Sequence, residues 1–164
     1  MATTYEPIAT TTLSSAAASI DFTSISGSYT DLRVVLVAAS DAGASIYCRY
    51  NSDTGTNYSS TRLTGNGTAA ASASQSNTAV PNSGRMPVSS TIFGLTTIDI
   101  FSYAGSTYKT SLIASSSDQN GSGEEFLNVN LWRSTSAITA VNLVPSSGNF
   151  VIGTKATLYG ITKA

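Results

Sequence analysis

The last forty residues of the chain constrain its fold most strongly, because their apolar residues alternate with the two-residue period of a β-strand. Three strand-like runs are separated by Ser, Thr, Gly and Pro: residues 126–133, 137–145 and 154–161. In the first run, two leucines and a valine fall on one face, and Asn128, Asn130 and Trp132 fall on the other. No segment here repeats its apolar residues at helical spacing. This pattern predicts a fold made of packed β-sheets.

Earlier segments continue the same pattern. Further strands are predicted at residues 19–25, 32–39, 46–51, 58–63, 96–103 and 108–115. The strand at 32–39 is apolar on both faces, as a central strand is, and the turn at 41–43 predicts a hairpin with the strand at 46–51. Roughly eight to ten strands at near-regular spacing predict an all-β, single-domain antiparallel β-sandwich of jelly-roll type.

Two segments interrupt this regular spacing. Residues 1–13 are predicted to form an extended N-terminal arm, because Pro7 lacks a backbone donor and favours an extended conformation at Glu6. Residues 66–90 begin with an Asn-Gly pair, which favours a tight turn, and are otherwise predicted to form a long variable surface loop. The sandwich domain is accordingly assigned to residues 14–164.

The arm has two interpretations. It is frayed, as chain termini commonly are, or it forms a clasp along the sheet edge of a neighbouring molecule. Three apolar anchors so close to a terminus favour the clasp, because they would gain little free energy in water. The candidate contacts with another protein chain are Tyr5, Glu6, Pro7 and Ile8.

The composition argues against catalysis. The chain has 28 Ser and 23 Thr among its 164 residues, only 8 basic and 9 acidic residues, and no histidine. A serine nucleophile would therefore lack its usual base. The single cysteine, Cys48, is predicted to be a small buried apolar residue. Asp99 lies inside a predicted strand on the face opposite Ile98 and Ile100, where solvent exposure is expected, so a catalytic pair of carboxylates is not predicted. No catalytic residue and no cofactor is predicted.

Nucleic acids and membranes are not expected as partners. The net charge is −1, and the basic residues are scattered rather than clustered as phosphate binding requires. The longest aliphatic run, residues 34–39, is far shorter than the ~20 residues that span a bilayer. The first residues have neither the basic nor the apolar segment of a secretory signal. We therefore expect synthesis in a cytoplasm.

The segment 118–124 shares some features with a calcium-binding loop. Asp118, Asn120 and Ser122 occupy alternating ligand positions, and a glycine follows where an EF-hand loop turns sharply. However, the twelfth position is Val129 instead of a glutamate, and no predicted helices flank the segment. The sequence therefore favours an exposed hairpin loop, and no metal site is predicted.

Carbohydrate binding requires exposed aromatic rings with amides nearby. Trp132 fits this requirement if the face that it shares with Asn128 and Asn130 points outward. The candidate glycan or interface aromatics are Trp132, Tyr58, Tyr103 and Tyr108. The alternative, which we favour, is that Trp132 caps the core or fills a subunit interface, because large aromatic side chains are usually mostly buried.

Several segments together resemble a known family. They are MATTYEPIATTTL at the start, residues 52–59, IDIFSYAGSTYKT at 98–110, LWRSTSAIT at 131–139 and the ending at 147–161. This set covers nearly the whole chain and resembles small virion structural proteins of tailed bacteriophages, particularly phages of aquatic bacteria including cyanobacteria. Residues 68–90 are the least similar, as a variable loop would be. The shared motifs are structural rather than catalytic.

The resemblance implies a β-sandwich attached to the outside of a phage particle. The first hypothesis is a non-enzymatic capsid decoration (cement) protein on the outer surface of the head. It would form a homotrimer, contact the major capsid protein through the arm and loops, and stabilise the shell by several weak contacts acting together. The alternative is a tail-fibre or appendage domain that binds a host surface glycan or receptor. A third hypothesis is a fibre-tip trimerisation domain without a ligand. All three imply assembly in the host cytoplasm and a final location in the virion.

Overall fold

The computed structural model describes residues 4–43 and 45–162, which form twelve strands and no helix. The larger sheet has eight strands in the order β1-β12-β3-β8-β9-β10-β5-β6. Their bounds are β1 (Tyr5–Thr12), β12 (Lys155–Ile161), β3 (Asp31–Ala38), β8 (Gly94–Phe101), β9 (Lys109–Ser117), β10 (Glu124–Trp132), β5 (Tyr58–Gly65) and β6 (Ala70–Thr78). The smaller sheet is β2 (Ile20–Phe22), β11 (Val141–Pro145), β4 (Ser45–Tyr50) and β7 (Asn82–Arg85), in that order.

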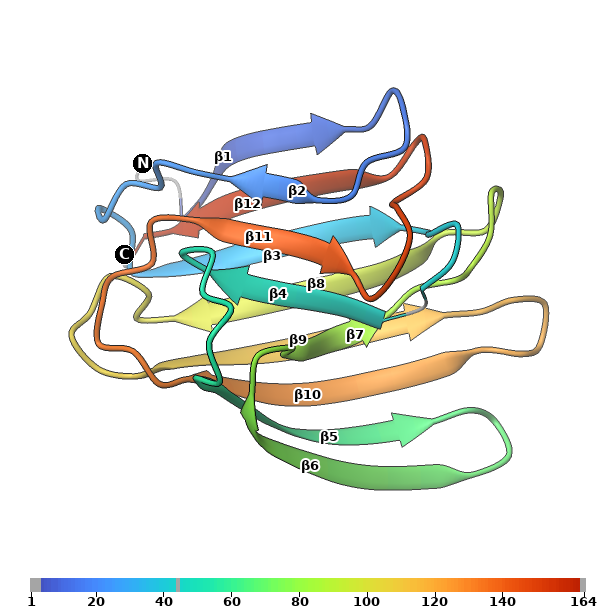
Figure 1. Ribbon diagram of the computed structural model, residues 1–164. Coiled ribbons are helices and arrows are strands. Elements are labelled where there is room, and N and C mark those ends of the chain that lie inside the picture. The colour runs from blue at the N-terminus through green and yellow to red at the C-terminus, as the bar shows by residue number, and fades with distance from the viewer. Residues whose placement is uncertain (1–3, 44, 163–164) are drawn as a thin grey trace.

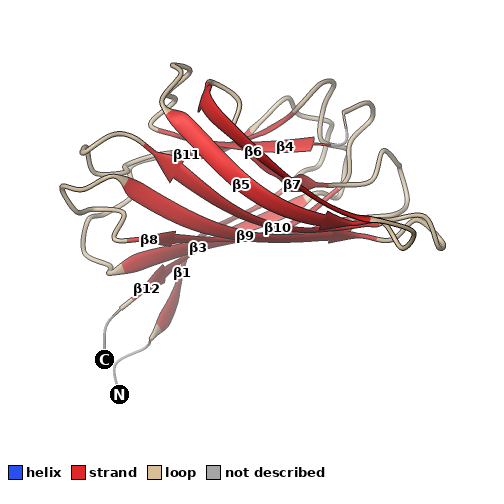
Figure 2. Cartoon of the chain, turned by 90° about the horizontal axis from the view of Figure 1, so that it is seen from below, coloured by secondary structure: helices blue, strands red, loops and turns tan. Residues whose placement is uncertain are grey.

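The two sheets stack face to face, with the smaller sheet over one face of the larger one (Figure 1). All neighbouring strands in both sheets are antiparallel. The larger sheet is strongly twisted, and the β5–β6 hairpin forms one end of it, beyond the smaller sheet (Figures 1 and 2). The all-β, antiparallel architecture predicted from the alternating pattern is therefore confirmed.

An aliphatic core lies between the smaller sheet and the strands β12, β3 and β8. On β3, Leu32, Val34 and Leu36 are fully buried and alternate with residues that are more exposed. The other buried aliphatic side chains in this part of the core are Ile20, Ile46, Ile98, Ile100, Val141, Leu143 and Leu158. Burial of this kind, worth about 25 cal/mol per Å² of apolar surface, is the main source of stability for the sandwich.

The predicted hairpin between residues 32–39 and 46–51 is wrong, because β3 and β4 lie in different sheets. The chain between them binds the loop that precedes β12. The backbone N–H of Asp41 donates to the carbonyl oxygen of Asn149 at 3.0 Å, and the Asp41 carboxylate accepts the Asn149 N–H at 2.7 Å. Hydrogen bonds from the Asn149 backbone and side chain hold the pKa of Asp41 below its ordinary value. This connection therefore crosses from one sheet to the other.

The predicted long loop at 66–90 is also wrong, because the segment contains β6 and β7. The predicted Asn66-Gly67 turn is present and joins β5 to β6. The side-chain oxygen of Asn66 accepts the backbone N–H groups of Thr68 and Ala69 at 3.0 and 2.8 Å. Gly67 has a φ of +84°, which glycine adopts without strain. This turn makes a strand of β6, although its Ala- and Ser-rich sequence gives little strand signal.

The N-terminal arm belongs to the sandwich. Residues 5–12 form β1 and pair with β12 along its length, with a bulge between Pro7 and Ala9. The side chain of Ile8 packs against the core. The alternative interpretation of a frayed arm is therefore wrong for these residues, and the sheet edge along which they lie belongs to the same chain. Residues 1–3 lie outside the described part of the chain. The clasp contacts proposed for Tyr5 and its neighbours would have to form on the outer edge of β1.

Candidate functional site

Strand β10 buries two asparagines between Phe126 and Trp132 and exposes leucine and valine on its other face. Asn128, Asn130 and Trp132 are 1%, 3% and 3% exposed, whereas Leu127 and Val129 on the opposite side are 49% and 44% exposed. The outward orientation of Trp132 that glycan binding would require is therefore wrong, and Trp132 is buried in the core, as the favoured interpretation has it. Strand β9 follows the same rule in part, with Ser111 and Ser115 buried.

The short strand β7 explains why these polar side chains point inward. β7 is the edge strand of the smaller sheet: β4 pairs with one of its edges, and no strand of the described residues pairs with the other. The unpaired edge lies over the inner face of β9 and β10. The side-chain amide of Asn128 donates to the carbonyl oxygen of Asn82 at 2.9 Å. The amide of Asn130 donates to the same oxygen at 3.2 Å and to the Ser83 hydroxyl at 3.1 Å. Side chains of the larger sheet therefore satisfy backbone groups of the smaller sheet, as buried polar groups require.

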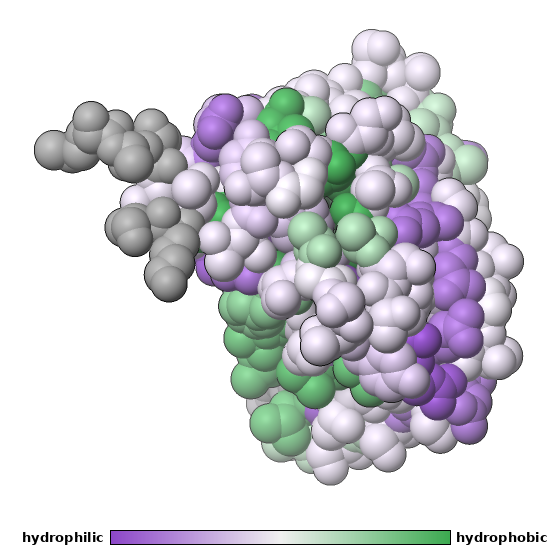
Figure 3. Space-filling view, turned by 90° about the vertical axis from the view of Figure 1, so that its left-hand side faces the viewer, coloured by the Kyte–Doolittle hydropathy of each residue, from purple (hydrophilic) through white to green (hydrophobic). Residues whose placement is uncertain are grey.

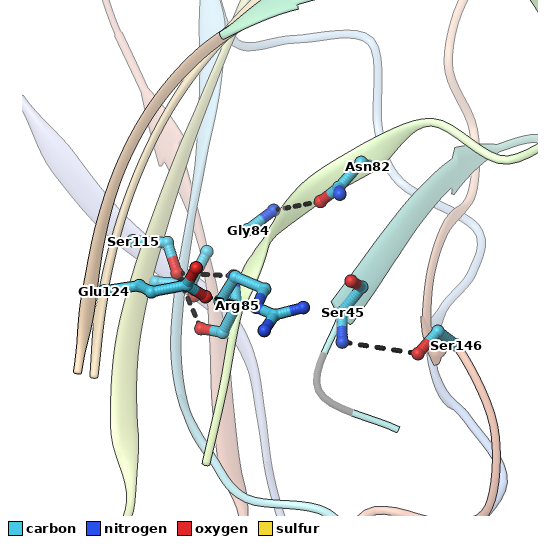
Figure 4. Close-up of polar contacts among 8 residues, drawn as sticks. Ser45, Asn82, Gly84, Arg85, Ser115, Glu124 and Ser146 are labelled. Carbon is cyan, nitrogen blue, oxygen red and sulfur yellow. Dashed lines mark hydrogen bonds and ion pairs between the residues drawn. The ribbon is translucent and has the colours of Figure 1, made fainter. Parts of the chain in front are cut away.

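Ser115 completes this attachment from β9 (Figure 4). Its hydroxyl accepts the backbone N–H of Arg85 at 2.9 Å and donates to the Arg85 carbonyl at 2.7 Å. The backbone approaches closely at Gly84, where a Cβ atom would lie 2.7 Å from the Ser115 side chain and φ is +124°. Only glycine fits here without moving one sheet from the other.

Trp132 and two tyrosines form a buried aromatic cluster at one end of this region. The rings of Tyr58 and Trp132 are stacked, with centroids 6.5 Å apart, and the Tyr50 ring is tilted against both. The indole N–H of Trp132 donates to the Asp53 carboxylate at 2.7 Å. Partial burial opposes ionisation of Asp53, but hydrogen bonds from Trp132, Asn57 and Gly55 outweigh it and lower the pKa. The cluster locks a loop onto the core and presents no aromatic ring to a sugar.

The two remaining aromatic candidates differ in exposure. Tyr103 is fully buried, and its hydroxyl donates to the Ser26 carbonyl and accepts the Tyr29 backbone N–H at 3.3 Å. Burial raises the pKa of Tyr103. Tyr108 is 55% exposed. Of the four predicted glycan or interface aromatics, Tyr108 alone therefore has a ring accessible to a ligand.

Sequence reasoning missed the exposed apolar surface on the outer side of the larger sheet. We call it the outer apolar face and define it by six exposed side chains: Leu63, Leu95, Phe101, Leu112, Leu127 and Val129. They lie on the adjacent strands β8, β9, β10 and β5, with Leu127 directly opposite Leu63 and Val129 directly opposite Leu112. Figure 3 shows hydrophobic side chains gathered along one flank of the molecule and hydrophilic side chains on the opposite flank.

The outer apolar face carries little net charge. Asp99 lies beside Leu112 but is held by Arg33, whose Nε and Nη2 donate to its carboxylate at 2.5 and 2.8 Å. The hydrogen bond to Asp99 raises the pKa of Arg33. Glu125 lies at the end of β10. By strand spacing, the four strands make a face of about 15 by 20 Å, comparable with the largest apolar patches of monomeric proteins, which are often functional.

The 118–124 loop uses its polar groups internally. The Asp118 carboxylate accepts the backbone N–H of Gly121 at 2.8 Å, and Glu124 forms an ion pair of 2.6 Å with Arg85. An open cleft of about 300 Å³ lies beside it, lined by residues that include Asn66 and Arg85. Among the described residues, no three Cys, Asp or Glu side chains gather where they could hold a metal ion. The loop acts as a turn between β9 and β10.

The thiol of Cys48 and the ammonium group of Lys109 are also buried in the fold. Cys48 is buried in the core, as predicted, and burial raises the pKa of its thiol to about 12. Lys109 is fully buried, its ammonium donates to the carbonyls of Gly105 and Thr107, and burial lowers its pKa. A thiol that stays protonated is a poor nucleophile, and the lysine nitrogen is enclosed in a turn.

No helix among the described residues is long and apolar enough to cross a membrane. No protein-family model matches the chain, and no characterised protein sequence matches it significantly. The function must therefore be argued from the outer apolar face and from the family that the sequence resembles.

Proposed function

We propose that the protein is a non-enzymatic structural component of a bacteriophage particle, a capsid decoration (cement) protein that binds the outside of the head. The outer apolar face carries this proposal. Its leucines, valine and phenylalanine are exposed although the strands that bear them are otherwise well ordered and hydrogen-bonded. A face of this kind is expected to lie against a partner, which we infer to be the major capsid protein.

The strand order supports a jelly-roll core for this proposal. Without the hairpins β5–β6 and β9–β10, eight strands remain in two four-stranded sheets, β1-β12-β3-β8 over β2-β11-β4-β7. The chain alternates between these two sheets except at β4 and β7, which are neighbours. Jelly rolls have eight strands in two sheets and are common in viral capsid proteins. The two additional hairpins extend one sheet, and they carry four of the six residues of the outer apolar face.

The size of the larger sheet also supports a docking role. By strand spacing, its whole outer side measures about 35 by 20 Å, close to the ~800 Å² that each partner buries in a standard protein interface. The Ser, Thr and Ala residues between the apolar side chains are small, so a partner could approach the backbone closely. The alternative of a glycan-binding tail domain loses support, because Trp132, Tyr58 and Tyr103 are buried.

Binding of the purified chain to heads that lack it tests this proposal. The decisive variant is Leu127→Glu/Val129→Glu, which places two charges on the outer apolar face. Ile152→Glu is the matched control, because Ile152 is an equally exposed apolar residue in the loop between β11 and β12. We expect the wild type and the control to bind in hundreds of copies per head and to raise its resistance to heat, and the double variant to do neither.

Two results would contradict the proposal. Quantitative gels of intact particles could show only a handful of copies, which indicates a tail component. Alternatively, the double variant could bind heads as well as the control does, which would show that the outer apolar face is not the contact surface. Circular dichroism of each variant confirms that the sheet is retained.

A further inference from the structure

The two edge strands of the larger sheet differ in how well they resist pairing with another strand. On β1, Pro7 lacks a backbone donor, Glu6 carries a charge, and the bulge between Pro7 and Ala9 interrupts the edge. These are the features by which natural sheets block their edges. Strand β6 contains no proline and no charged residue, and its own bulge, at residues 76 and 77, lies near the end of the strand. Its register with β5 is regular from Ala70 to Gln75.

Strand β6 is also exposed on both faces. Residues 70–77 are all exposed, and only Thr78 is buried. The strand therefore gains almost nothing from hydrophobic burial, and β5 is the one strand with which it forms a ladder among the described residues. Alanine, serine and asparagine are also poor strand formers by themselves. A second strand on the free edge would supply the backbone hydrogen bonds that this position lacks.

The edge of β6 is nevertheless fixed in place at both ends. At one end, the Asn66 turn joins it to β5. At the other end, the guanidinium of Arg133 donates to the Asn77 side-chain oxygen at 2.6 Å, and Thr78 pairs with the buried Tyr58. A partner strand would therefore meet a preset row of backbone donors and acceptors and would lose little entropy in ordering it.

We propose that β6 pairs antiparallel with β6 of a second copy of this chain, so that two eight-stranded sheets join into one continuous sheet across a two-fold axis. Two-fold pairing places a strand opposite itself, and an uncharged strand of small residues can do this without like charges or bulky side chains in conflict. Arg133 is bonded to Asn77 at one end of β6, and an antiparallel pair centred within residues 70–75 places the two Arg133 side chains at opposite ends. On the adjacent strand β5 the cation is Arg62. The two Arg62 strands would lie three strand spacings apart, about 14 Å, which exceeds the ~8 Å screening length at physiological salt.

Head-to-tail pairing of β6 with β1 of a neighbour is the competing arrangement within this chain. It would build rings or open filaments, since each copy would use two different edges. The proline and bulge of β1 interrupt the ladder that this arrangement needs. The two-fold arrangement uses the regular edge twice, and is therefore favoured. It does not depend on what the outer apolar face binds.

Sedimentation of the full chain over a range of concentrations tests the pairing. We expect the wild type to reach a dimer mass. Ala71→Lys/Ala73→Lys should weaken the dimer at least about tenfold, because it places like charges along the paired edge. Ala9→Lys on β1 is the matched control, as an exposed alanine in the opposite edge strand of the same sheet, and should leave the dimer unchanged.

Cysteine crosslinking gives an independent readout. Single cysteines at positions 70 to 75 should include at least one that forms a disulfide-linked dimer under mild oxidation, because the two-fold axis brings one position close to itself. Native Cys48 is buried and should not interfere. A monomer at all concentrations, a trimer, or a dimer indifferent to the β6 lysines would overturn the pairing. A monomeric chain that still binds heads would overturn the pairing and leave the proposed function intact.

Discussion

The two halves of the larger sheet differ in how many polar side chains they bury. Under the centre of the smaller sheet, β12, β3 and β8 turn aliphatic residues inward, and the interior is a conventional apolar core. On β9, β10 and β5 the interior mixes serine and asparagine with Ile113 and aromatic side chains, and the leucines and the valine of these strands are outside or only partly buried. The difference arises at β7, whose backbone is bonded by Asn128, Asn130 and Ser115. The hydrogen-bonding needs of β7 therefore act together with burial of Ile113 and the aromatic side chains in deciding which face of these strands turns inward.

This comparison also separates the two roles of the molecule. The inner face of the larger sheet provides stability, because its apolar side chains are removed from water within one chain. The outer faces of β8, β9, β10 and β5 leave apolar side chains available for another molecule. The following experiments test that separation, beginning with the largest expected effect.

A matched pair of leucine substitutions tests the two halves directly. Leu158→Ala in β12 should lower the free energy of unfolding by about 2–5 kcal/mol, because it leaves a cavity in the aliphatic core. Leu127→Ala on the outer apolar face should change it by less than about 0.5 kcal/mol. Urea denaturation of both variants measures the difference. Equal losses would show that the outer face is packed in the isolated chain.

Two single substitutions on opposite faces of β10 test why an asparagine faces the interior. Asn130→Val should cost about 1 kcal/mol although it makes the interior more apolar, because the Ser83 hydroxyl and the Asn82 carbonyl lose a donor. The loss is kept small because the Asn130 side-chain oxygen is itself buried without a hydrogen-bond partner. Val129→Asn, one residue away and facing outward, is the control and should be nearly neutral. A stabilised Asn130→Val variant would contradict our account of β7.

The two tyrosines beside the β8–β9 turn should differ in a smaller way. Tyr103→Phe removes a buried hydroxyl that bonds two backbone groups, and should cost about 0.5–1.5 kcal/mol. Tyr108→Phe removes an exposed hydroxyl and should cost at most a few tenths of a kcal/mol. Thermal unfolding monitored by circular dichroism is sufficient to compare them. A larger loss of stability for Tyr108→Phe than for Tyr103→Phe would indicate that the Tyr108 hydroxyl makes a contact that the structure does not show.

The smallest effect concerns the pH dependence of the aromatic cluster. The folded state lowers the pKa of Asp53, so the folded state binds its proton less readily than the unfolded state. The stabilisation from Asp53 is therefore fully present above the ordinary aspartate pKa of about 3.9 and is lost as the pH falls through the lower folded value. Asp53→Asn should remove this part of the acid-induced loss of stability. Glu125→Gln, at an exposed position, is the control, and equal curves for the two variants would disprove the assignment.

Local patterns in the sequence were sufficient for most strands but not for all of them. Where apolar residues alternate, as in β8, β9 and β12, the predicted ranges overlap the strands observed. Strand β6 has no such alternation and was predicted as part of a loop; it forms because the Asn66 turn folds it back onto β5. The sequence around the turn after β3 is compatible with a hairpin. It carries no information about the hydrogen bonds between residues 39–43 and a loop more than one hundred residues away.

The candidate site shows the same limit more clearly. The alternation of β10 correctly separated Leu127, Val129 and Leu131 from Asn128, Asn130 and Trp132, but it could not say which set faces the core. The usual rule that apolar residues are buried fails on β10 for Leu127 and Val129, although Phe126 and Trp132 on the same strand are buried. The signal that could have shown this was the hydroxyl-rich inner positions of β9, at Ser111 and Ser115, in phase with the asparagines of β10.

The sequence by itself determined that this chain forms antiparallel sheets and carries no histidine-based chemistry, because period-two alternation and residue inventory are local properties. Only the tertiary structure decided which faces are buried and which edges remain open. Those properties depend on whether a distant segment, here β7, brings backbone groups that need hydrogen-bond partners. The same placement of β7 that draws the asparagines inward leaves the leucines and the valine on the surface, where the proposed partner would bind.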